Sequence, residues 1–441
     1  MTNTSMEAIM KNETFAPISG VDFFAKRSKE KKIVDNVFAM GEKVEKAKKL
    51  YGDKVINGTI GALLDNNETI LIYDAIKSTY FSLSTKEHFS YADTFSGTHS
   101  YKTAVKNWVI LPEHAEALKE FHIEVTASPG GSGAISSAIH NFLDPGEKIL
   151  LADISYPIYD FSIREYDAIP VEYSLFTKNL NFNLKDLEEK SHEILKTQDK
   201  LILLLNDPCQ NPTGYSLSPQ EWHELTLLLN RFAKTHKVIF IVDIAYIDFD
   251  PRGKKLTRDF LFDIAQLDES VLTLLIFSCS KSFSCYGLRS GAQIALTKNR
   301  DIIEAYKNIQ YHSCLGIWAT TSRVAMTLFS TILATPEHLA QLELEQEKSR
   351  DLLIERADIF IQEAKKVGIE HYPYGGGFFI TLIEPSTPER ISNFLSLCIE
   401  KNIFLVPLKK SIRIAISSIP THKISGLATH LKEILDVLNK S

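Results

Sequence analysis

The sequence predicts an α/β protein in which a large domain holds a mostly parallel sheet covered by helices on both faces, next to a smaller α+β domain. From about residue 130, short strands that are apolar throughout alternate with helical stretches. Strands that are apolar on both faces need cover on both sides, which helices between parallel strands provide. After residue 334 the pattern changes to long amphipathic helices separated by short strands, and this change predicts the second unit.

The individual elements follow from hydrophobic periodicity and from helix-start signals. Ser218-Pro219, Thr335-Pro336 and Thr387-Pro388 each indicate a first helical turn, where proline fits well. The expected helices are 39–51, 132–143, 218–234, 336 to about 368, one from 388, and 427–438. The expected strands are 55–60, 148–152, 200–205, 238–242, 271–277, 378–383, 403–406 and 413–416. They divide the chain into an N-terminal arm (1–30), a large domain (66–333) and a small domain (31–65 with 334–441).

The composition excludes several classes of protein. The 441 residues are 44% hydrophobic and 24% charged, which is typical of a globular chain with a large core. A net charge of −6 leaves no basic excess to hold nucleic acid. The apolar runs are too short to cross a bilayer, and the polar N-terminus does not resemble a signal peptide. Five cysteines without a Cys-x-x-Cys pair favour free thiols in a reducing cytoplasm.

A glycine-rich stretch, Ser128–Ala134, leads directly into a predicted helix. Glycines let the backbone approach an anion and a helix N-terminus offers free N–H groups, so the stretch is expected to cradle a phosphate. A dinucleotide fingerprint would need glycine in place of Ser136, although Asp153 stands about 20 residues on, where its ribose-binding acid belongs. A Walker loop would need Gly-Lys-Ser/Thr, which the stretch lacks. Taken alone, a plain glycine-rich turn is an equally good interpretation.

Lys281 closely follows the apolar strand 271–277, at the carboxyl edge where open α/β sheets bind ligands. Burial there disfavours the charged form of a lysine and makes its amine nucleophilic. Arg289, eight positions later, can pair with a phosphate through two N–H groups. Ser278-x-x-Lys also matches the nucleophile motif of β-lactamases, but the companion Ser-Asp-Asn and Lys-Thr-Gly elements are absent from the sequence. An ordinary solvated loop lysine is the remaining alternative.

Two other strand ends carry polar groups of interest. Asp243 ends the buried strand 238–242, where a carboxylate can hold a pyridinium nitrogen protonated, and Tyr246 could donate to a phenolate oxygen. Asn211 lies in the turn 206–214, which its prolines and glycine make rigid. Taken separately, a turn-capping aspartate and a simple turn explain both features.

Together these motifs are specific. Asn-Pro-x-Gly at Asn211, Asp-x-Ala-Tyr at Asp243, and Ser-x-x-Lys at Lys281 with Arg289 eight positions later follow one another on successive strand ends. In this combination, from about Val55 to Ile416, the chain resembles the fold-type I, class I/II pyridoxal-phosphate aminotransferases related to aspartate aminotransferase. The resemblance implies an enzyme that moves an amino group between an L-amino acid and a 2-oxo acid by a ping-pong route. It also implies a homodimer with shared active sites, without nucleic-acid or membrane partners.

The resemblance assigns roles around the cofactor. Lys281 would hold pyridoxal phosphate as a Schiff base and then move the α-proton. Asp243 would pair with the pyridine nitrogen, and Tyr246 and Asn211 would hydrogen-bond the ring oxygen. Tyr156 matches the aromatic residue that stacks on the ring. The implied phosphate-binding residues are Gly131, Ser132, Ser278 and Arg289.

The resemblance also assigns the substrate side of the site. Arg413 matches the arginine that binds the substrate α-carboxylate, together with Asn211, and Gly61 matches the glycine beside it. Tyr91 matches the tyrosine that reaches the phosphate across the dimer interface. Its spacing to Gly97 is one residue longer than usual, which puts this contact in doubt.

Substrate and reaction type are less defined by the sequence. The stretch 308–318, where dicarboxylate enzymes carry a partner-subunit arginine, contains none. Tyr311, His312 and Trp318 favour an aromatic or neutral side chain, although helix packing explains them equally well. A β-lyase, an aminocyclopropane-carboxylate-synthase-like enzyme or a decarboxylase would share the same site residues. A regulator with an aminotransferase-like domain is disfavoured by the acidic charge. Cys209, Cys279 and Cys285 are expected to be free thiols near the cofactor without a ligand role, and no metal is expected.

Overall fold

The computed structural model describes residues 23–25, 28 and 36–440, and the chain divides into two compact units, 1–36 and 37–441. In the first unit the described residues form a short turn, in which the Ser28 amide donates to the Ala25 carbonyl over 2.8 Å. Most of the predicted arm over 1–30 lies outside the described residues. Helix α1 (Asn36–Tyr51) leads into the second unit.

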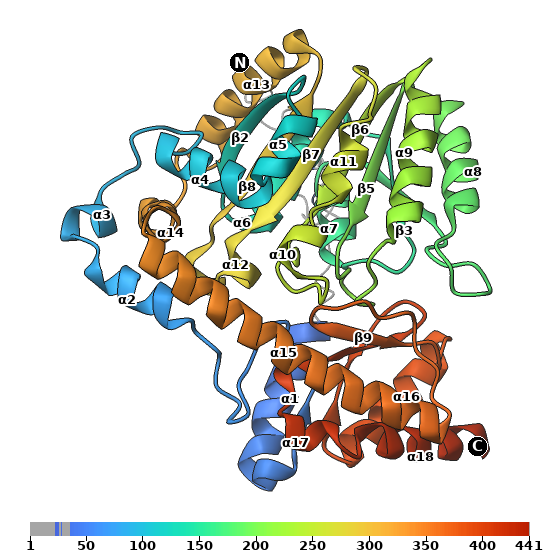
Figure 1. The fold of residues 1–441 in the computed structure, drawn as a ribbon. Coiled ribbons are helices and arrows are strands. Elements are labelled where there is room, and N and C mark those ends of the chain that lie inside the picture. Colours follow the sequence, from blue (N-terminus) through green and yellow to red (C-terminus); the bar gives the residue numbers. More distant parts are fainter. Residues whose placement is uncertain (1–22, 26–27, 29–35, 441) are drawn as a thin grey trace, which may run out of the picture. The chain divides into compact units, whose positions relative to one another are not determined.

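The second unit is built around a large sheet (Figure 1). Over residues 37–440 this sheet has seven strands in the order β2-β8-β7-β6-β5-β3-β4. Their bounds are β2 His122–Ser128, β3 Lys148–Ala152, β4 Ile169–Tyr173, β5 Lys200–Asn206, β6 Lys237–Asp243, β7 Val271–Ser278 and β8 Gly291–Thr297. Neighbouring strands run parallel from β7 to β4, whereas β8 is antiparallel to both β7 and β2. The predicted mostly parallel sheet is therefore confirmed.

The two faces of the sheet support separate hydrophobic cores. On β5, Leu201, Leu203 and Leu205 join one cluster of buried side chains, while Ile202 and Leu204 join the other. This alternation follows from the two-residue period of a strand. The first core is covered by α4 (His99–Val109), α8 (Leu184–Leu195), α9 (Pro219–Ala233), α11 (Phe260–Ile264) and α14 (Arg323–Ala334). The second is covered by α6 (Gly130–Phe142), α7 (Ile158–Glu165) and α13 (Arg300–Ile317).

Helix starts agree closely with the sequence signals. Helix α9 begins at Pro219, and the Ser218 hydroxyl accepts the Glu221 amide while the Glu221 carboxylate accepts the Ser218 amide. Such a capping box satisfies two N–H groups that the first turn leaves without partners. Helix α6 begins at Gly130, two residues before the predicted start.

The shorter helical segments are α2 (Asp74–Ser82), α3 (Thr85–Phe89), α5 (Pro112–Ala117), α10 (Gly253–Leu256), α12 (Cys279–Ser282), η3 (Gly52–Lys54), η4 (Tyr286–Leu288) and η5 (Ile416–Ser418).

The C-terminal part of the chain has a core of its own. Its sheet has three antiparallel strands, in the order β11 (Val406–Pro407), β12 (Ile412–Ala415) and β9 (Phe379–Leu382). This sheet packs with α16 (Pro388–Glu400), α17 (Thr421–Ile424), α18 (Leu427–Lys440) and the second half of α15 (Pro336–Val367). Strand β1 (Ile56–Asn57) pairs in parallel with β10 (Ile403–Phe404). This pairing is two residues long, so the predicted strand over 55–60 is shorter than expected. The division at 66 and 333 stays a prediction.

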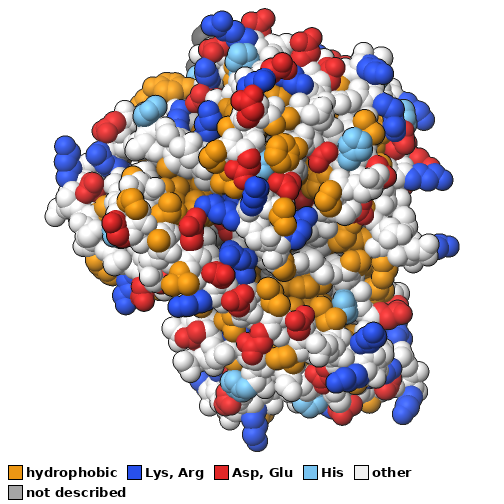
Figure 2. Space-filling model, in the orientation of Figure 1, with side chains coloured by type: hydrophobic (Ala, Val, Ile, Leu, Met, Phe, Trp, Pro, Cys, Tyr) orange, Lys and Arg blue, Asp and Glu red, His pale blue; other side chains and the backbone are white. Residues whose placement is uncertain are grey.

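Side chains of both charges cover the face seen in Figure 2, with apolar side chains between them. None of the helices within residues 36–440 is long and apolar enough to cross a membrane. The five cysteines are all free thiols, and only Cys285 among them is not fully buried.

Candidate active site

Three neighbouring parallel strands end at the same edge of the large sheet. In the register of β5, β6 and β7, Asn206 lies beside Asp243 and Asp243 lies beside Ile276. The turn with Asn211 follows β5, Asp243 ends β6, and Lys281 follows β7 by three residues. The sheet therefore gathers the predicted groups at its carboxyl edge, where this class of sheet binds ligands.

Lys281 lies in the short helix α12, whose first turn is capped by the Ser278 hydroxyl. Its ammonium donates to the Gly61 carbonyl oxygen. Burial, and then the positive charges of Arg413 and Arg289, lower the pKa of Lys281 to about 7, and Asp243 opposes this shift. About half of the amine is then neutral near pH 7, which a nucleophile or proton acceptor requires.

Aromatic rings surround the Lys281 amine. The ring centroids of Tyr286, Phe378 and Tyr246 lie 4.9, 5.6 and 5.8 Å from Lys281 Nζ. Tyr246 is buried, and burial raises the pKa of its phenol well above the usual value, so the hydroxyl stays a donor. These rings exclude water from the amine and so help to keep its pKa low.

Asp243 is buried and held by two donors. The Tyr159 hydroxyl donates to Oδ2 over 2.6 Å, and the Ala245 amide donates to Oδ1 over 3.0 Å. Burial raises the pKa of Asp243 to about 6, while these hydrogen bonds lower it. The carboxylate is consequently mostly ionised at neutral pH, as a partner for a cationic ring nitrogen must be.

The glycine-rich stretch forms an open anion cradle at the start of α6. A Cβ on Gly130, whose φ is +76°, would lie 2.6 Å from Arg289 Nη2, and one on Gly131 would lie 3.3 Å from Ser278 Cβ. A side chain at residue 130 would displace Arg289 and would need a left-handed backbone that favours glycine, and one at residue 131 would crowd Ser278, so the two glycines keep the cradle open. Arg289 Nη1 donates to the Ser280 hydroxyl over 3.2 Å. Ser132 and Arg289 are exposed, so the free N–H groups and the guanidinium can meet a phosphate.

Arg413 reaches the site from β12. Its guanidinium donates to Asn211 Oδ1 and to the Thr59 carbonyl, each over 3.2 Å, and lies 4.3 Å from the Phe379 ring centroid. The side chain is buried, and Nε has no partner among residues 36–440. A buried N–H without an acceptor is costly, so Arg413 is prepared for an anionic ligand.

Tyr156 is partly buried and meets Tyr159 edge to face, with centroids 5.5 Å apart. Burial raises the pKa of Tyr156, and the positive charge of Arg413 opposes this effect. Gly61 also lies in the site, because an added Cβ would be 3.4 Å from the Phe379 ring and 3.7 Å from Lys281 Nζ. The structure thus places Tyr156 beside Tyr159, and Gly61 beside Lys281 and Phe379.

Tyr91 is not among these groups. Its side chain is 85% exposed, and its carbonyl accepts a hydrogen bond from Arg323. Tyr311 and His312 are exposed on α13, and Tyr311 meets Phe95 edge to face. The roles predicted for these three residues depend on a second subunit and stay predictions.

Several contacts were not indicated by the motifs. They involve Thr59, Tyr159, Ser280, Tyr286, Phe378 and Phe379. Tyr159 had a usable signal, because it follows Tyr156 by only three residues and the two rings meet edge to face. Ser280 and Tyr286 lie in the stretch around Lys281 but match no motif, whereas Thr59, Phe378 and Phe379 reach the site through tertiary packing, which leaves no local pattern.

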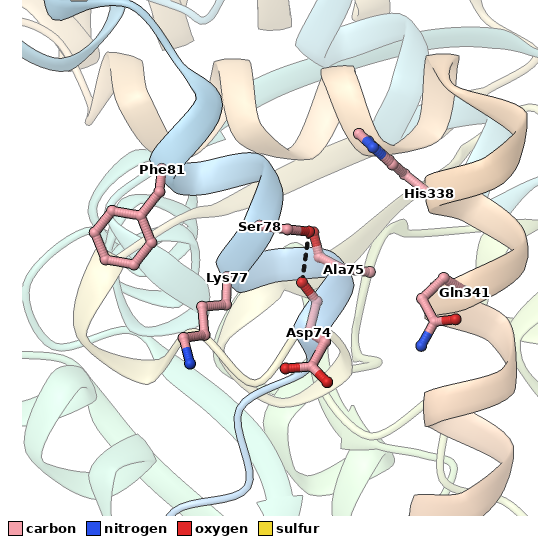
Figure 3. Close-up of a pocket in the computed structure, with 7 residues that line it drawn as sticks. All are labelled: Asp74, Ala75, Lys77, Ser78, Phe81, His338 and Gln341. Atoms are coloured by element: carbon pink, nitrogen blue, oxygen red, sulfur yellow. Dashed lines mark hydrogen bonds between the residues drawn. The ribbon is translucent and has the colours of Figure 1, made fainter.

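A pocket of about 400 Å³ lies elsewhere, between α2 and α15 (Figure 3). Its lining residues are Asp74, Ala75, Lys77, Ser78, Phe81, His338 and Gln341. The Ser78 hydroxyl donates to the Asp74 carbonyl of its own helix over 2.7 Å. None of the predicted site residues takes part in this pocket.

Comparisons with known proteins agree with this geometry. Residues 53–431 match the model of the family aminotransferase class I and II. An aromatic-amino-acid aminotransferase of Pseudomonas aeruginosa is 27% identical over 53% of this chain and 57% of its own length. An aspartate aminotransferase of Haemophilus influenzae is 22% identical over 91% of this chain and 98% of its own. The crystal structure of an aminotransferase from Anaerococcus prevotii superposes with a TM-score of 0.88, at 31% identity over 93% of this chain and 98% of the other. The chain therefore belongs to the class I and II aminotransferases, enzymes whose cofactor is pyridoxal phosphate.

Proposed function

We propose that this protein transfers an amino group from an L-amino acid with an aromatic or neutral side chain to a 2-oxo acid, by a ping-pong route. The observation that carries the proposal is the partly buried Lys281, whose amine is half neutral near pH 7 between two arginines and a buried aspartate. Two arginines suit two anions: the phosphate of the cofactor and the carboxylate of the substrate.

The residues at the sheet edge fit pyridoxal phosphate. The cradle at the start of α6, with Ser278 and Arg289, suits the phosphate group. Asp243 suits the pyridine nitrogen, and Lys281 suits covalent attachment of the cofactor. When bound, the cofactor supplies an electron sink that stabilises negative charge at the substrate α-carbon.

Lys281 is the group proposed to move the proton. Its amine accepts the α-proton at Nζ and can return it to a neighbouring carbon, since a pKa near 7 suits both directions. The Gly61 carbonyl holds one N–H of the free amine and so limits the directions in which the lone pair can point.

Arg413 is proposed to bind the substrate carboxylate through Nε and a terminal nitrogen. Asn211 Oδ1 accepts from the other terminal nitrogen and keeps the guanidinium in place. The rings of Tyr156, Phe378 and Phe379 near these groups support an aromatic or neutral substrate side chain. The name of the Pseudomonas relative agrees with this preference, whereas that of the Haemophilus relative points to a dicarboxylate, so the substrate test below includes both.

A homodimer with shared sites is part of the proposal. Large apolar side chains are exposed on and after α2 and α3, where Phe81, Phe89 and Tyr91 are 75, 85 and 85% exposed. Exposed apolar patches of this kind support a protein interface, from which Tyr91 could reach the partner's phosphate site. Five free thiols support a reducing compartment such as the cytoplasm.

The test is a half-reaction screen. Single amino acids, including phenylalanine, tyrosine, leucine and aspartate, are added to the holoenzyme without acceptor while its visible spectrum is followed. Phenylalanine or leucine should shift the spectrum and yield one equivalent of 2-oxo acid. In Lys281→Ala, borohydride reduction should leave no cofactor bound to the chain. Release of ammonia and pyruvate from a β-substituted amino acid, without amino transfer, would instead favour a β-lyase.

A further inference from the structure

Between Lys281 and Arg289, two side chains contact a segment more than 200 residues away in the sequence. The Tyr286 hydroxyl accepts the Leu63 amide over 2.9 Å. The Ser284 hydroxyl donates to the Leu71 carbonyl. Leu63 and Leu71 are themselves joined, because the Leu71 amide donates to the Leu63 carbonyl over 3.0 Å.

The segment held in this way borders the proposed substrate site. Alternate residues present backbone groups to three site side chains: the Thr59 carbonyl accepts from Arg413, the Gly61 carbonyl accepts from Lys281, and the Leu63 amide donates to Tyr286. Three backbone groups of the segment 59–63 therefore contact site side chains, so this segment forms part of the wall of the site.

Tyr286 is well suited to hold the segment 59–63 in place. Its ring lies 4.9 Å from Lys281 Nζ, so the phenol is anchored in the same loop as the lysine. Burial raises the pKa of Tyr286 to about 12, and the hydroxyl stays neutral across the working range of pH. The hydrogen bond to Leu63 therefore does not switch with pH, and its role is geometric.

We propose that Tyr286, with Ser284, is a positioning residue that holds the segment 59–71 against the lysine loop and so sets the carboxylate subsite around Arg413. The inference rests on the proposed function, in that it takes Arg413 as the carboxylate anchor. Loosening the segment frees the Thr59 carbonyl from Arg413, and the guanidinium loses one of the two acceptors that orient it. The affinity for substrate carboxylates falls more than the affinity for the cofactor, because Arg289 and Asp243 lie outside the segment 59–71.

The test compares Tyr286→Phe with the wild-type holoenzyme. The matched control is Tyr166→Phe, which removes a phenol bonded to the Ser136 hydroxyl over 3.0 Å at the end of α7. Hydrogen exchange of peptides covering 59–72 is measured first, since it needs no turnover. The dissociation constants of pyridoxal phosphate and of 3-phenylpropionate, a carboxylate without an amino group, follow by dialysis and spectral titration.

The expected result for Tyr286→Phe is faster exchange in 59–72 and roughly 3- to 10-fold weaker binding of 3-phenylpropionate, the size of one lost hydrogen bond, with a smaller change in cofactor affinity. The control should match the wild type in all three measurements. If Tyr286→Phe does not fold, Ser284→Ala removes the second tie and should give the same pattern.

Unchanged exchange in 59–72 would overturn the proposal, as would a loss confined to cofactor affinity. These outcomes are distinct from failure of the proposed function, which would appear in the wild type as no reaction with any amino acid.

Discussion

Replacing Tyr159 with phenylalanine isolates the contribution of one hydroxyl to the cofactor site. The Tyr159 hydroxyl donates to Asp243 Oδ2 over 2.6 Å, and the phenyl ring of the variant keeps the packing against Tyr156. A hydrogen bond to a charged group contributes about 1.5–3 kcal/mol, which corresponds to roughly one to two pKa units. Without it, the pKa of Asp243 in the apoenzyme should rise from about 6 to roughly 7–8.

The sign of the effect follows from the protonation of Asp243. A raised pKa means that the neutral carboxyl persists to higher pH, and a neutral carboxyl cannot pair with a pyridinium nitrogen. At pH 7 the ionised fraction of Asp243 should fall from about nine tenths to between about one half and one tenth. The apparent dissociation constant of pyridoxal phosphate should therefore rise roughly two- to tenfold at pH 7 and approach the wild-type value near pH 9.

The assay is the dissociation constant of pyridoxal phosphate for both apoenzymes at pH 6.5, 7.5 and 9. The ratio of variant to wild type is the useful quantity, because the titration of the cofactor itself cancels in it. Tyr166→Phe again serves as the control and should give a ratio near one throughout. A ratio that is the same at all three pH values would refute the reasoning, because a packing defect does not depend on the protonation of Asp243.

Two other predictions concern the cationic groups of the site. Labelling of Lys281 in the apoenzyme by an amine-reactive reagent, followed by peptide mapping, should increase with pH around a midpoint near 7, because burial and two arginines lower its pKa; a midpoint near 10 would contradict this. Arg413→Lys replaces a guanidinium, which can donate two parallel hydrogen bonds to a carboxylate, by an ammonium group. The KM for the amino acid should therefore rise by about 10- to 100-fold, with a smaller change in kcat. An equal fall in kcat at unchanged KM would assign Arg413 to the chemical step instead.

The parts of the site that could be predicted are those that follow strands directly. Asp243 and Lys281 come at or just after strands that are apolar throughout, so sequence alone fixes the sheet edge at which they lie. Tyr286 and Phe379 could not be found in this way. Tyr286 lies in the same loop as Lys281, but its contact with Leu63 depends on how the segment 59–71 packs against that loop. Phe379 meets Arg413 only through the packing of β9.

The fold, too, could be predicted from the sequence only in part. The continuous apolar strands predicted the parallel centre of the sheet, because only burial on both faces explains them. Strands β2 and β4 are at its edges, where side chains are partly exposed and the apolar pattern weakens. Strand β8 is buried, but its sequence Gly-Ala-Gln-Ile-Ala-Leu-Thr contains no signal of its antiparallel direction.

Under the proposed function, the charges around Lys281 would serve first the attachment of the cofactor and then the transfer of a proton. In the apoenzyme, Arg289 and Arg413 add to burial and lower the pKa of the amine to about 7, and its neutral form can react with a carbonyl. A phosphate at Arg289 and a carboxylate at Arg413 offset both positive charges, whereas Asp243 still favours the protonated amine. The pKa of Lys281 should therefore be higher with both anions in place than without them. In the proposed reaction the released amine would then be a stronger base when it takes the α-proton, which would link anion binding and proton transfer through the same two arginines.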